Sequence, residues 1–422
     1  MKTNIQQRSL TDCLDNVIDY RGKTPKKLGL EWCNVGYRAI SANNVKFDGL
    51  TKIDSINCLD EAGYKKWMKE EVKKGDLLLT SEAPAGQVML WMNDEKIVLS
   101  QRLFALRTKP DVYNKYLKYY LQSNVGQFEI NKNTSGSTVF GISAKMFDFI
   151  KVNLPDYDSQ ISIGDLLYLI DSKIELNNRI NAELEAMAKT LYDYWFVQFD
   201  FPDKNGKPYK TSGGKMVWND ELKREIPEGW EVKRIGDFGE FKNGINYDPS
   251  LEGNTDAKII NVRNISSSNL FVSQFDLDTI RLQKSNVDKY LVTDKDILIA
   301  RSGIPGATRM MLEFAENTIY CGFIIRFQVN SIIEKNYLFY FLKDMEKNTT
   351  SKSGGTIMPN VNQDTMKRML VIEPNEKVVI KFNEFINPVF RKMNEIIQEN
   401  EKLSELRDWL LPMLMNGQVK VN

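Results

Sequence analysis

The side chains that most often perform chemistry in enzymes are sparse in this chain of 422 residues. Histidine is absent, which excludes His-dependent catalytic triads, His metal ligands and His proton shuttles. The four cysteines (Cys13, Cys33, Cys58 and Cys321) are scattered and form no C-x-x-C pair, so neither a zinc site nor a disulfide framework is indicated. The sequence also contains no Walker A loop, no strand-linked G-x-G-x-x-G and no G-x-S-x-G elbow.

Carboxylates are plentiful, but no pair is marked by its context as an acid/base couple, and no metal site is predicted. A metal-dependent nuclease built on Asp, Glu and Lys stays open as an alternative. Residues 1–150 carry 22 Lys or Arg against 17 Asp or Glu, whereas residues 156–200 carry 3 against 9. This difference in charge suits a first lobe that binds an anion and an acidic segment that binds protein. The composition therefore favours a binding protein.

Residues 154–199 carry an apolar heptad pattern on one long helix. The repeating positions are Ile163, Leu167, Ile170, Ile174, Leu184 and Leu191, interrupted by the polar Asn177 and Asn181. Such a seam predicts a partner helix along its length. A core helix of one large domain is the alternative.

A second heptad pattern follows Pro374. Its positions include Phe382, Ile386, Met393, Ile396, Asn400 and Leu403. Pro388 is expected to kink this helix, and Pro412 and Gly417 to end it. The two helices are expected to pack on each other, with Asn177 or Asn181 facing Asn400 to fix the register.

The two halves of the chain repeat each other at an offset of about 220 residues. The matching segments are 40–45 (ISANNV) with 260–265 (INVRNI), 75–79 (GDLLL) with 295–299 (KDILI), 83–86 (APAG) with 303–306 (GIPG), and 116–121 (YLKYYL) with 337–342 (YLFYFL). The polar loop at 131–138 returns at 348–356. Matches in the same order at one offset indicate a duplicated lobe, each copy followed by a long helix.

Within the first lobe, residues 37–42, 76–80, 88–92 and 103–107 are predicted strands and 113–125 a helix. The basic run at 20–27 contains Gly22 and Pro25, which we expect to exclude helix. Residues 200–230 are expected to form turns and a small hairpin.

A duplicated lobe on stiff helices suits a protein that reads two sites on DNA, although two protein partners or two glycans fit the duplication alone. Lys and Arg in the loops are candidates for phosphate contacts, and Asn and Arg for base edges. The candidate DNA-binding residues of the first lobe are Tyr20, Arg21, Lys23, Lys26, Lys27, Asn43, Asn44, Lys46, Ser81, Gln87, Lys132, Ser137 and Thr138. Those of the second lobe are Asn243, Asn246, Tyr247, Arg263, Asn264, Arg301, Ser302, Arg309, Lys352 and Thr356.

Several motifs resemble those of the specificity subunits of type I restriction-modification systems. They are Leu154-Pro155 followed by Gln160, then 170–177 (IDSKIELN), 194–197 (YWFV), 226–232 (IPEGWEV), 75–78 (GDLL) and 136–138 (GST). The second lobe departs from the pattern with Lys295 in place of the glycine and with only a partial match at 355–356. The resemblance covers essentially the whole chain.

The resemblance implies an α+β fold in which two mixed α/β target recognition lobes alternate with two long helices, paired as an antiparallel coiled coil with pseudo-two-fold symmetry. The implied domains are a first target recognition domain (1–153), a central conserved helix (154–199), a connector (200–230), a second target recognition domain (231–373) and a C-terminal conserved helix (374–422).

Each lobe is implied to read one half of a bipartite, asymmetric target in double-stranded DNA. The helices are implied to dock two modification (methyltransferase) subunits, which use S-adenosylmethionine, and restriction (translocase-nuclease) subunits, which use ATP and Mg. The chain itself is then expected to be non-catalytic, to hold no cofactor or metal, and to be cytoplasmic without a membrane segment. A stand-alone two-lobed DNA-binding protein is the alternative.

Overall fold

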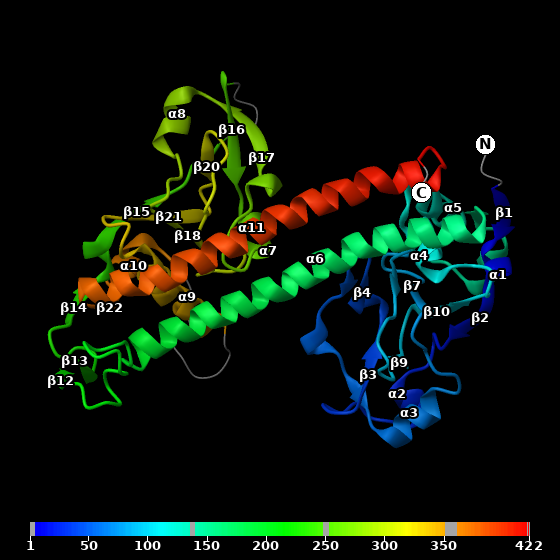
Figure 1. Ribbon diagram of the computed structural model, residues 1–422, viewed down its shortest axis with the longest axis horizontal. Coiled ribbons are helices and arrows are strands. Elements are labelled where there is room, and N and C mark those ends of the chain that lie inside the picture. The colour runs from blue at the N-terminus through cyan, green and yellow to red at the C-terminus, as the bar shows by residue number, and fades with distance from the viewer. Residues whose placement is uncertain (1–4, 136–139, 248–252, 351–360, 420, 422) are drawn as a thin grey trace. The chain divides into compact units, whose positions relative to one another are not determined.

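Two long helices and two sets of small sheets make up the fold (Figure 1). The computed structural model describes residues 5–135, 140–247, 253–350, 361–419 and 421, with backbone alone for 347–350. The chain divides into two units: unit 1 is Met1–Leu176 with Lys402–Asn422, and unit 2 is Asn177–Glu401. Both long helices, α6 (Tyr157–Tyr192) and α11 (Glu376–Met415), contribute residues to each unit.

Within the described residues, unit 1 contains three sheets and a separate two-stranded hairpin. Its elements are β1 (Gln6–Ser9), α1 (Leu10–Cys13), β2 (Leu14–Asp19), α2 (Pro25–Leu28), β3 (Tyr37–Ile40), β4 (Val45–Lys46), β5 (Gly49–Leu50), β6 (Cys58–Leu59), α3 (Glu61–Trp67), β7 (Leu77–Thr80), β8 (Val88–Leu90), β9 (Val98–Leu99), β10 (Leu103–Thr108), α4 (Asn114–Gln122), α5 (Asn124–Lys132) and β11 (Lys151–Leu154). The sheets run β1-β11, β2-β10-β7-β8 and β6-β3-β9, beside a β4-β5 hairpin.

Unit 2 repeats these sheets after a hairpin of β12 (Met216–Asn219) and β13 (Arg224–Pro227). Its further elements are β14 (Glu231–Arg234), β15 (Gly239–Asn243), β16 (Thr255–Ile260), α7 (Val262–Ser267), β17 (Asp278–Leu282), α8 (Lys284–Lys289), β18 (Asp296–Ala300), β19 (Thr308–Arg309), β20 (Thr318–Tyr320), β21 (Ile324–Val329), α9 (Lys335–Thr350), α10 (Gln363–Lys367) and β22 (Leu370–Glu373). The sheets run β14-β22, β15-β21-β18-β19 and β17-β16-β20. Strand order and direction match unit 1 sheet by sheet, parallel pairs included. The predicted duplication is confirmed.

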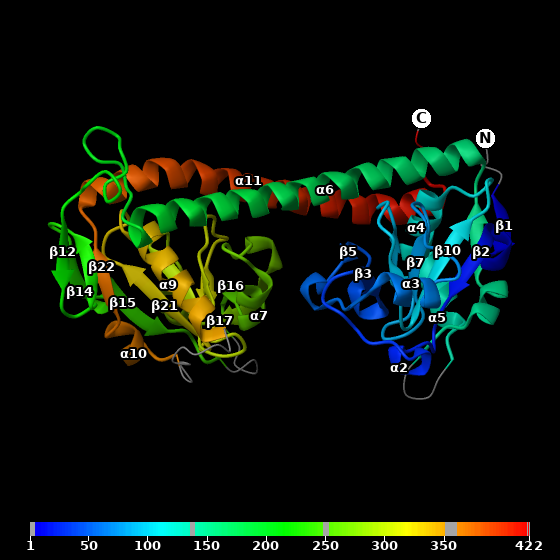
Figure 2. The same cartoon turned by 90° about the horizontal axis from the view of Figure 1, so that it is seen from below.

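Alternating side chains on the four-stranded sheet give each unit two apolar layers. Leu77 and Leu79 pack with α4 and the long helices, whereas Leu78 packs with the three-stranded sheet and Trp67. In unit 2, Ile297 and Ile299 pack with α9 and the long helices, and Leu298 packs with the three-stranded sheet. Figure 2 shows α9 beside the four-stranded sheet of this unit. A sheet covered on both faces explains why these strands read as continuous apolar runs.

The two long helices pair in both units with opposite chain directions. In unit 1, Ile163 and Leu167 of α6 share a buried cluster with Leu414 and Met415 of α11. In unit 2, the predicted seam residues of α11 (Phe382, Ile386 and Met393) are buried, and Leu184 and Leu191 of α6 pack against the same cluster. Of the other seam positions, Ile170 and Ile396 are buried, and Ile174 and Leu403 are half-buried.

A polar layer interrupts the helix pair within unit 2. The buried Asn177 side chain donates from Nδ2 to Asn400 Oδ1 and to Glu399 Oε2, both at 2.8 Å. Asn400 in turn donates to Asn178 Oδ1 at 2.9 Å. Asn181 does not reach Asn400; its Nδ2 donates to the Met393 carbonyl at 3.4 Å. Asn177, and not Asn181, is therefore the residue that faces Asn400.

Two local expectations were wrong. The basic run at 20–27 includes a helical turn, α2, because Pro25 occupies the first helical position and Thr24 accepts a hydrogen bond from the Lys27 N–H. The second was wrong only in part: α11 is continuous through Pro388 and runs past Pro412, but it ends at Met415, two residues before Gly417. A left-handed Gly417 (φ 67°) follows its end.

Candidate nucleic-acid interface

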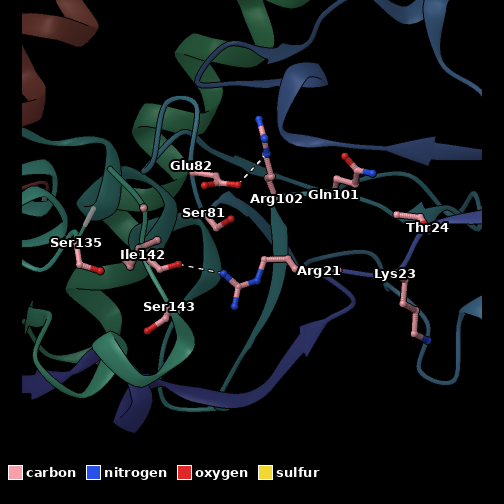
Figure 3. Close-up of a pocket in the computed structure, with 12 residues that line it drawn as sticks. Arg21, Lys23, Thr24, Ser81, Glu82, Gln101, Arg102, Ser135, Ile142 and Ser143 are labelled. Carbon is pink, nitrogen blue, oxygen red and sulfur yellow. Dashed lines mark hydrogen bonds and ion pairs between the residues drawn. The ribbon is translucent and has the colours of Figure 1, made fainter. Parts of the chain in front are cut away.

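The polar loops of unit 1 enclose a groove of about 410 Å³ at the end of its four-stranded sheet. It is lined by the turn that follows β2, the loops beyond β7 and β9, and the segment around residues 141–143 (Figure 3). Three predicted DNA-binding residues lie here, namely Arg21, Lys23 and Ser81. The structure thus brings together side chains that are up to 60 positions apart in the sequence.

Arg21 is held in one orientation by several contacts. Its Nε and Nη2 face the Asp19 carboxylate at 2.9 and 2.8 Å, and its Nη1 donates to the Ile142 carbonyl at 3.1 Å (Figure 3). The guanidinium also stacks over the Phe104 ring, 3.9 Å from its centroid. Arg21 therefore places a fixed positive charge in the groove, partly balanced by Asp19.

Tyr20 and Lys23 fasten the same turn to the core. The Tyr20 hydroxyl accepts from the Glu70 N–H at 2.6 Å, and Lys23 Nζ donates to the Trp67 carbonyl at 2.7 Å. Partial burial, with Lys69 nearby, lowers the pKa of Lys23 below its usual value. Both residues have a role in the fold, and Lys23 also lines the groove.

Four predicted DNA-binding residues are buried, namely Asn44, Asn264, Arg309 and, at the wall of the groove, Ser81. Asn44 accepts from the Ser41 N–H at 3.1 Å, and Asn264 accepts in the same way from the Asn261 N–H at 2.7 Å. Arg309 is inside unit 2, where it donates to the Ser268 carbonyl and pairs with Glu346. These side chains hold loops together and do not face solvent.

The remaining first-lobe candidates lie outside the core. Lys26, Asn43 and Lys132 are exposed, as is Lys27, whose Nζ donates to the Gly22 carbonyl at 2.9 Å. Lys46 and Gln87 are half-buried, and Gln87 accepts from the Phe47 N–H at 3.3 Å. Ser137 and Thr138 lie outside the described residues.

In unit 2, Arg301 occupies the place that Ser81 has in unit 1. The Arg301 N–H donates to the Phe323 carbonyl and the Ser81 N–H to the Arg102 carbonyl, each at 2.8 Å. Arg301 is exposed and Ser302 half-buried. Arg263 is exposed but paired with Asp276 and Asp278 at 3.0 and 2.8 Å.

Three of the other second-lobe candidates lie at the end of β15 or directly after it. Asn246 is exposed, while Asn243 and Tyr247 are half-buried, and Tyr247 packs against the core of the three-stranded sheet. Lys352 and Thr356 lie outside the described residues.

Sequence reasoning missed the part of the groove formed by Glu82, Gln101 and Arg102. Gln101 and Arg102 belong to a three-residue connection between β9 and β10, where no Gly or Pro marks a loop. Arg102 lies opposite residue 81 because β10 pairs with β7. A single sequence does not show which strands pair.

Among the described residues, no group of three or more Cys, Asp or Glu side chains is placed to hold a metal ion. No helix within the described ranges is long and apolar enough to span a membrane. Of the four aromatic residues between positions 192 and 196, Tyr192, Trp195 and Phe196 are buried in the unit 2 core, whereas Tyr194 is exposed.

Comparison with known proteins gives consistent results. Residues 8–186 and 227–403 match the family described as the type I restriction modification DNA specificity domain. The chain is 27% identical to the type I restriction enzyme MjaIX specificity subunit of Methanocaldococcus jannaschii over 86% of this chain and 82% of that protein. It is 25% identical to the HindI specificity subunit of Haemophilus influenzae, over 83% and 88% respectively. The crystal structure of a type I restriction-modification S subunit from M. genitalium has a similar fold, with a TM-score of 0.59, 14% identity, and coverage of 98% of this chain and 96% of that one.

Proposed function

Because the chain belongs to the type I restriction modification DNA specificity family, we propose that it is the subunit that selects the DNA target of a type I restriction-modification complex. The observation that carries this proposal is the internal duplication. Two units share the same three sheets in the same order, yet differ in the side chains that their loops present.

Each unit reads one half of a bipartite target. The two units have the same arrangement of strands, but equivalent loop positions have different residue types. Ser81 corresponds to Arg301, and Arg102 corresponds to Phe323. Such differences suit two readers with different preferences for base edges. Because the two units differ, the two halves of the DNA target differ in sequence and the target is asymmetric.

The long helices also carry a surface that supports docking of partner subunits. Four apolar side chains of α6 are 37–67% exposed, at Leu169, Leu176, Ile180 and Met187. Spacings of seven, four and seven residues place them on one face of the helix, away from the buried seam. We assign this stripe to two modification subunits and expect restriction subunits to join the same complex.

The chemistry then resides in the partners. S-adenosylmethionine is used by the modification subunits, and ATP with Mg by the restriction subunits, while this chain supplies the choice of sequence. Methylation of adenine within the target is the readout of the complete system.

Replacing residues 1–150 with the first lobe of a related protein tests this proposal. We expect one half of the methylated sequence to change and the other half to stay, because each unit has its own core and its own loops. The measurement is a map of methylated adenines in DNA from cells that carry the complete system. A change in both halves, or in neither, contradicts the assignment of one reader to each half-site. Full sequence-specific affinity of the purified chain alone would favour a stand-alone DNA-binding protein.

A further inference from the structure

One ion pair in the unit 1 groove has a geometry suited to reading DNA. Arg102 Nε lies 2.8 Å from Glu82 Oε1, with the two side chains 52% and 34% exposed (Figure 3). Both residues line the groove, together with Arg21 and Lys23. The pair is thus presented to solvent beside two further positive charges.

The backbone fixes both members of the pair. Arg102 has φ 61°, a left-handed conformation that costs an arginine free energy and that glycine adopts readily. Its carbonyl accepts from the Ser81 N–H, and Glu82 is bridged to Gly141. These backbone contacts hold the two side chains beside each other at the groove.

The two side chains match the two halves of one base pair. An arginine fork donates to guanine O6 and N7, and a glutamate accepts from the cytosine amino group. The ion pair uses Arg102 Nε, so the two terminal Nη nitrogens form the edge available to a guanine. Arg102 thus offers hydrogen-bond donors beside the acceptor oxygens of Glu82. A G·C pair presents the matching groups in the major groove, the guanine acceptors beside the cytosine amino group.

Unit 2 has different residues at these positions. The place of Arg102 is taken by Phe323, which is 60% exposed, and the place of Glu82 by Ser302. A phenyl ring and a hydroxyl do not provide the same pattern of donors and acceptors. Any preference that arises from the pair therefore belongs to the first half-site.

We propose that Arg102 and Glu82 together read a G·C base pair in the half of the target that unit 1 recognises. The inference rests on the proposed function and adds one specificity-determining contact to it.

The test uses Arg102→Gly in the complex with modification subunits and a library of randomised duplex DNA. Glycine suits φ 61°, so the midpoint of thermal unfolding should not fall. We expect the preference for G·C to disappear at one position of the first half, with a roughly 10- to 100-fold loss of affinity for the wild-type target. Arg102→Gln, whose amide suits adenine, should also lose the guanine preference.

Arg281→Ala is the matched control, because Arg281 Nε lies 2.8 Å from Asp256 Oδ1 in an exposed pair of unit 2. It should leave the first half unchanged. If Arg102→Gly selects the same bases as wild type, or loses affinity equally for all sequences, the base-reading inference is overturned. If the wild-type complex selects no sequence at all, the proposed function itself fails.

Discussion

Asp171 of α6 connects the unit 1 lobe to both long helices. Its carboxylate accepts from Lys118 Nζ at 2.7 Å and from the Tyr119 hydroxyl at 2.6 Å, both on α4. On α11, Arg407 Nη1 lies 3.1 Å from the other carboxylate oxygen. Burial opposes ionisation of Asp171, but these three partners outweigh it and hold its pKa below the usual value.

Asp171→Asn should destabilise unit 1 by about 3–5 kcal/mol, because it leaves the buried Lys118 without its counter-ion. Asp165→Asn is the matched control, since Asp165 accepts from Lys115 and Tyr113, each at 2.7 Å, but is 48% exposed. We expect it to cost under about 1 kcal/mol. The measurement is urea unfolding at pH 7, and equal losses for the two variants would contradict this interpretation.

The sign of the pH dependence follows from the depressed pKa of Asp171. Its stabilising contribution is complete above the unfolded-state pKa of about 4, and is lost as pH falls through the lower folded-state pKa. The difference in unfolding free energy between wild type and Asp171→Asn should therefore shrink when unfolding is repeated at pH 3.

Residue type alone does not reveal which polar side chains face DNA. Asn44 and Asn264 have the chemistry of adenine readers, yet each accepts a backbone hydrogen bond that closes a turn. Arg309 has the chemistry of a phosphate contact, yet it pairs with Glu346 inside unit 2. Burial distinguishes a side chain that stabilises a loop from one that is accessible to DNA. Burial depends on tertiary contacts that a single sequence leaves undetermined.

At the scale of elements, the sequence was more informative. The strands at 76–80 and 103–107 and the helix at 113–125 were predicted because their apolar runs are bounded by turn residues, and they appear as β7, β10 and α4. The duplication was predicted because packing constraints recur in both units. In the three-stranded sheet of unit 1, only the central strand was predicted, at 37–42 (β3); its neighbours β6 and β9 were missed, since they have only two residues each.

The polar layer of the helix pair gives a prediction at the same scale. Asn177→Leu should destabilise unit 2 by about 1–3 kcal/mol, because the partly buried Asn400 Oδ1 loses its donor. Adding Asn400→Leu should recover most of that loss, since an apolar pair then fills the seam, while register specificity falls. The double-mutant cycle is measured by denaturant unfolding, with oligomeric state as the readout of register.

Asn181→Leu is the control for this layer. The Asn181 Oδ1 is buried with no hydrogen-bond partner among the described residues, and its Nδ2 makes only the 3.4 Å contact with Met393. Replacement by leucine should therefore stabilise unit 2. If Asn177→Leu stabilises to the same extent, the Asn177–Asn400 pair contributes nothing to the helix interface.

At the scale of the whole molecule, the proposed function gives the long helices a second task, because both contribute to each unit. Seven residues inserted after Leu176 and seven after Glu401 preserve the heptad phase of both helices, since these positions adjoin the Asn177–Asn400 layer. The helix pair lengthens by about 10 Å at 1.5 Å per residue. At roughly 3.4 Å per base pair, we expect the gap in the methylated sequence to grow by about three base pairs, with both halves unchanged.

Seven Gly and Ser residues inserted at the exposed turn around Asn205 are the control, because they add the same length outside the helices. A gap that stays constant in the helix variant, or that grows equally in the control, would show that the helices do not set the spacing.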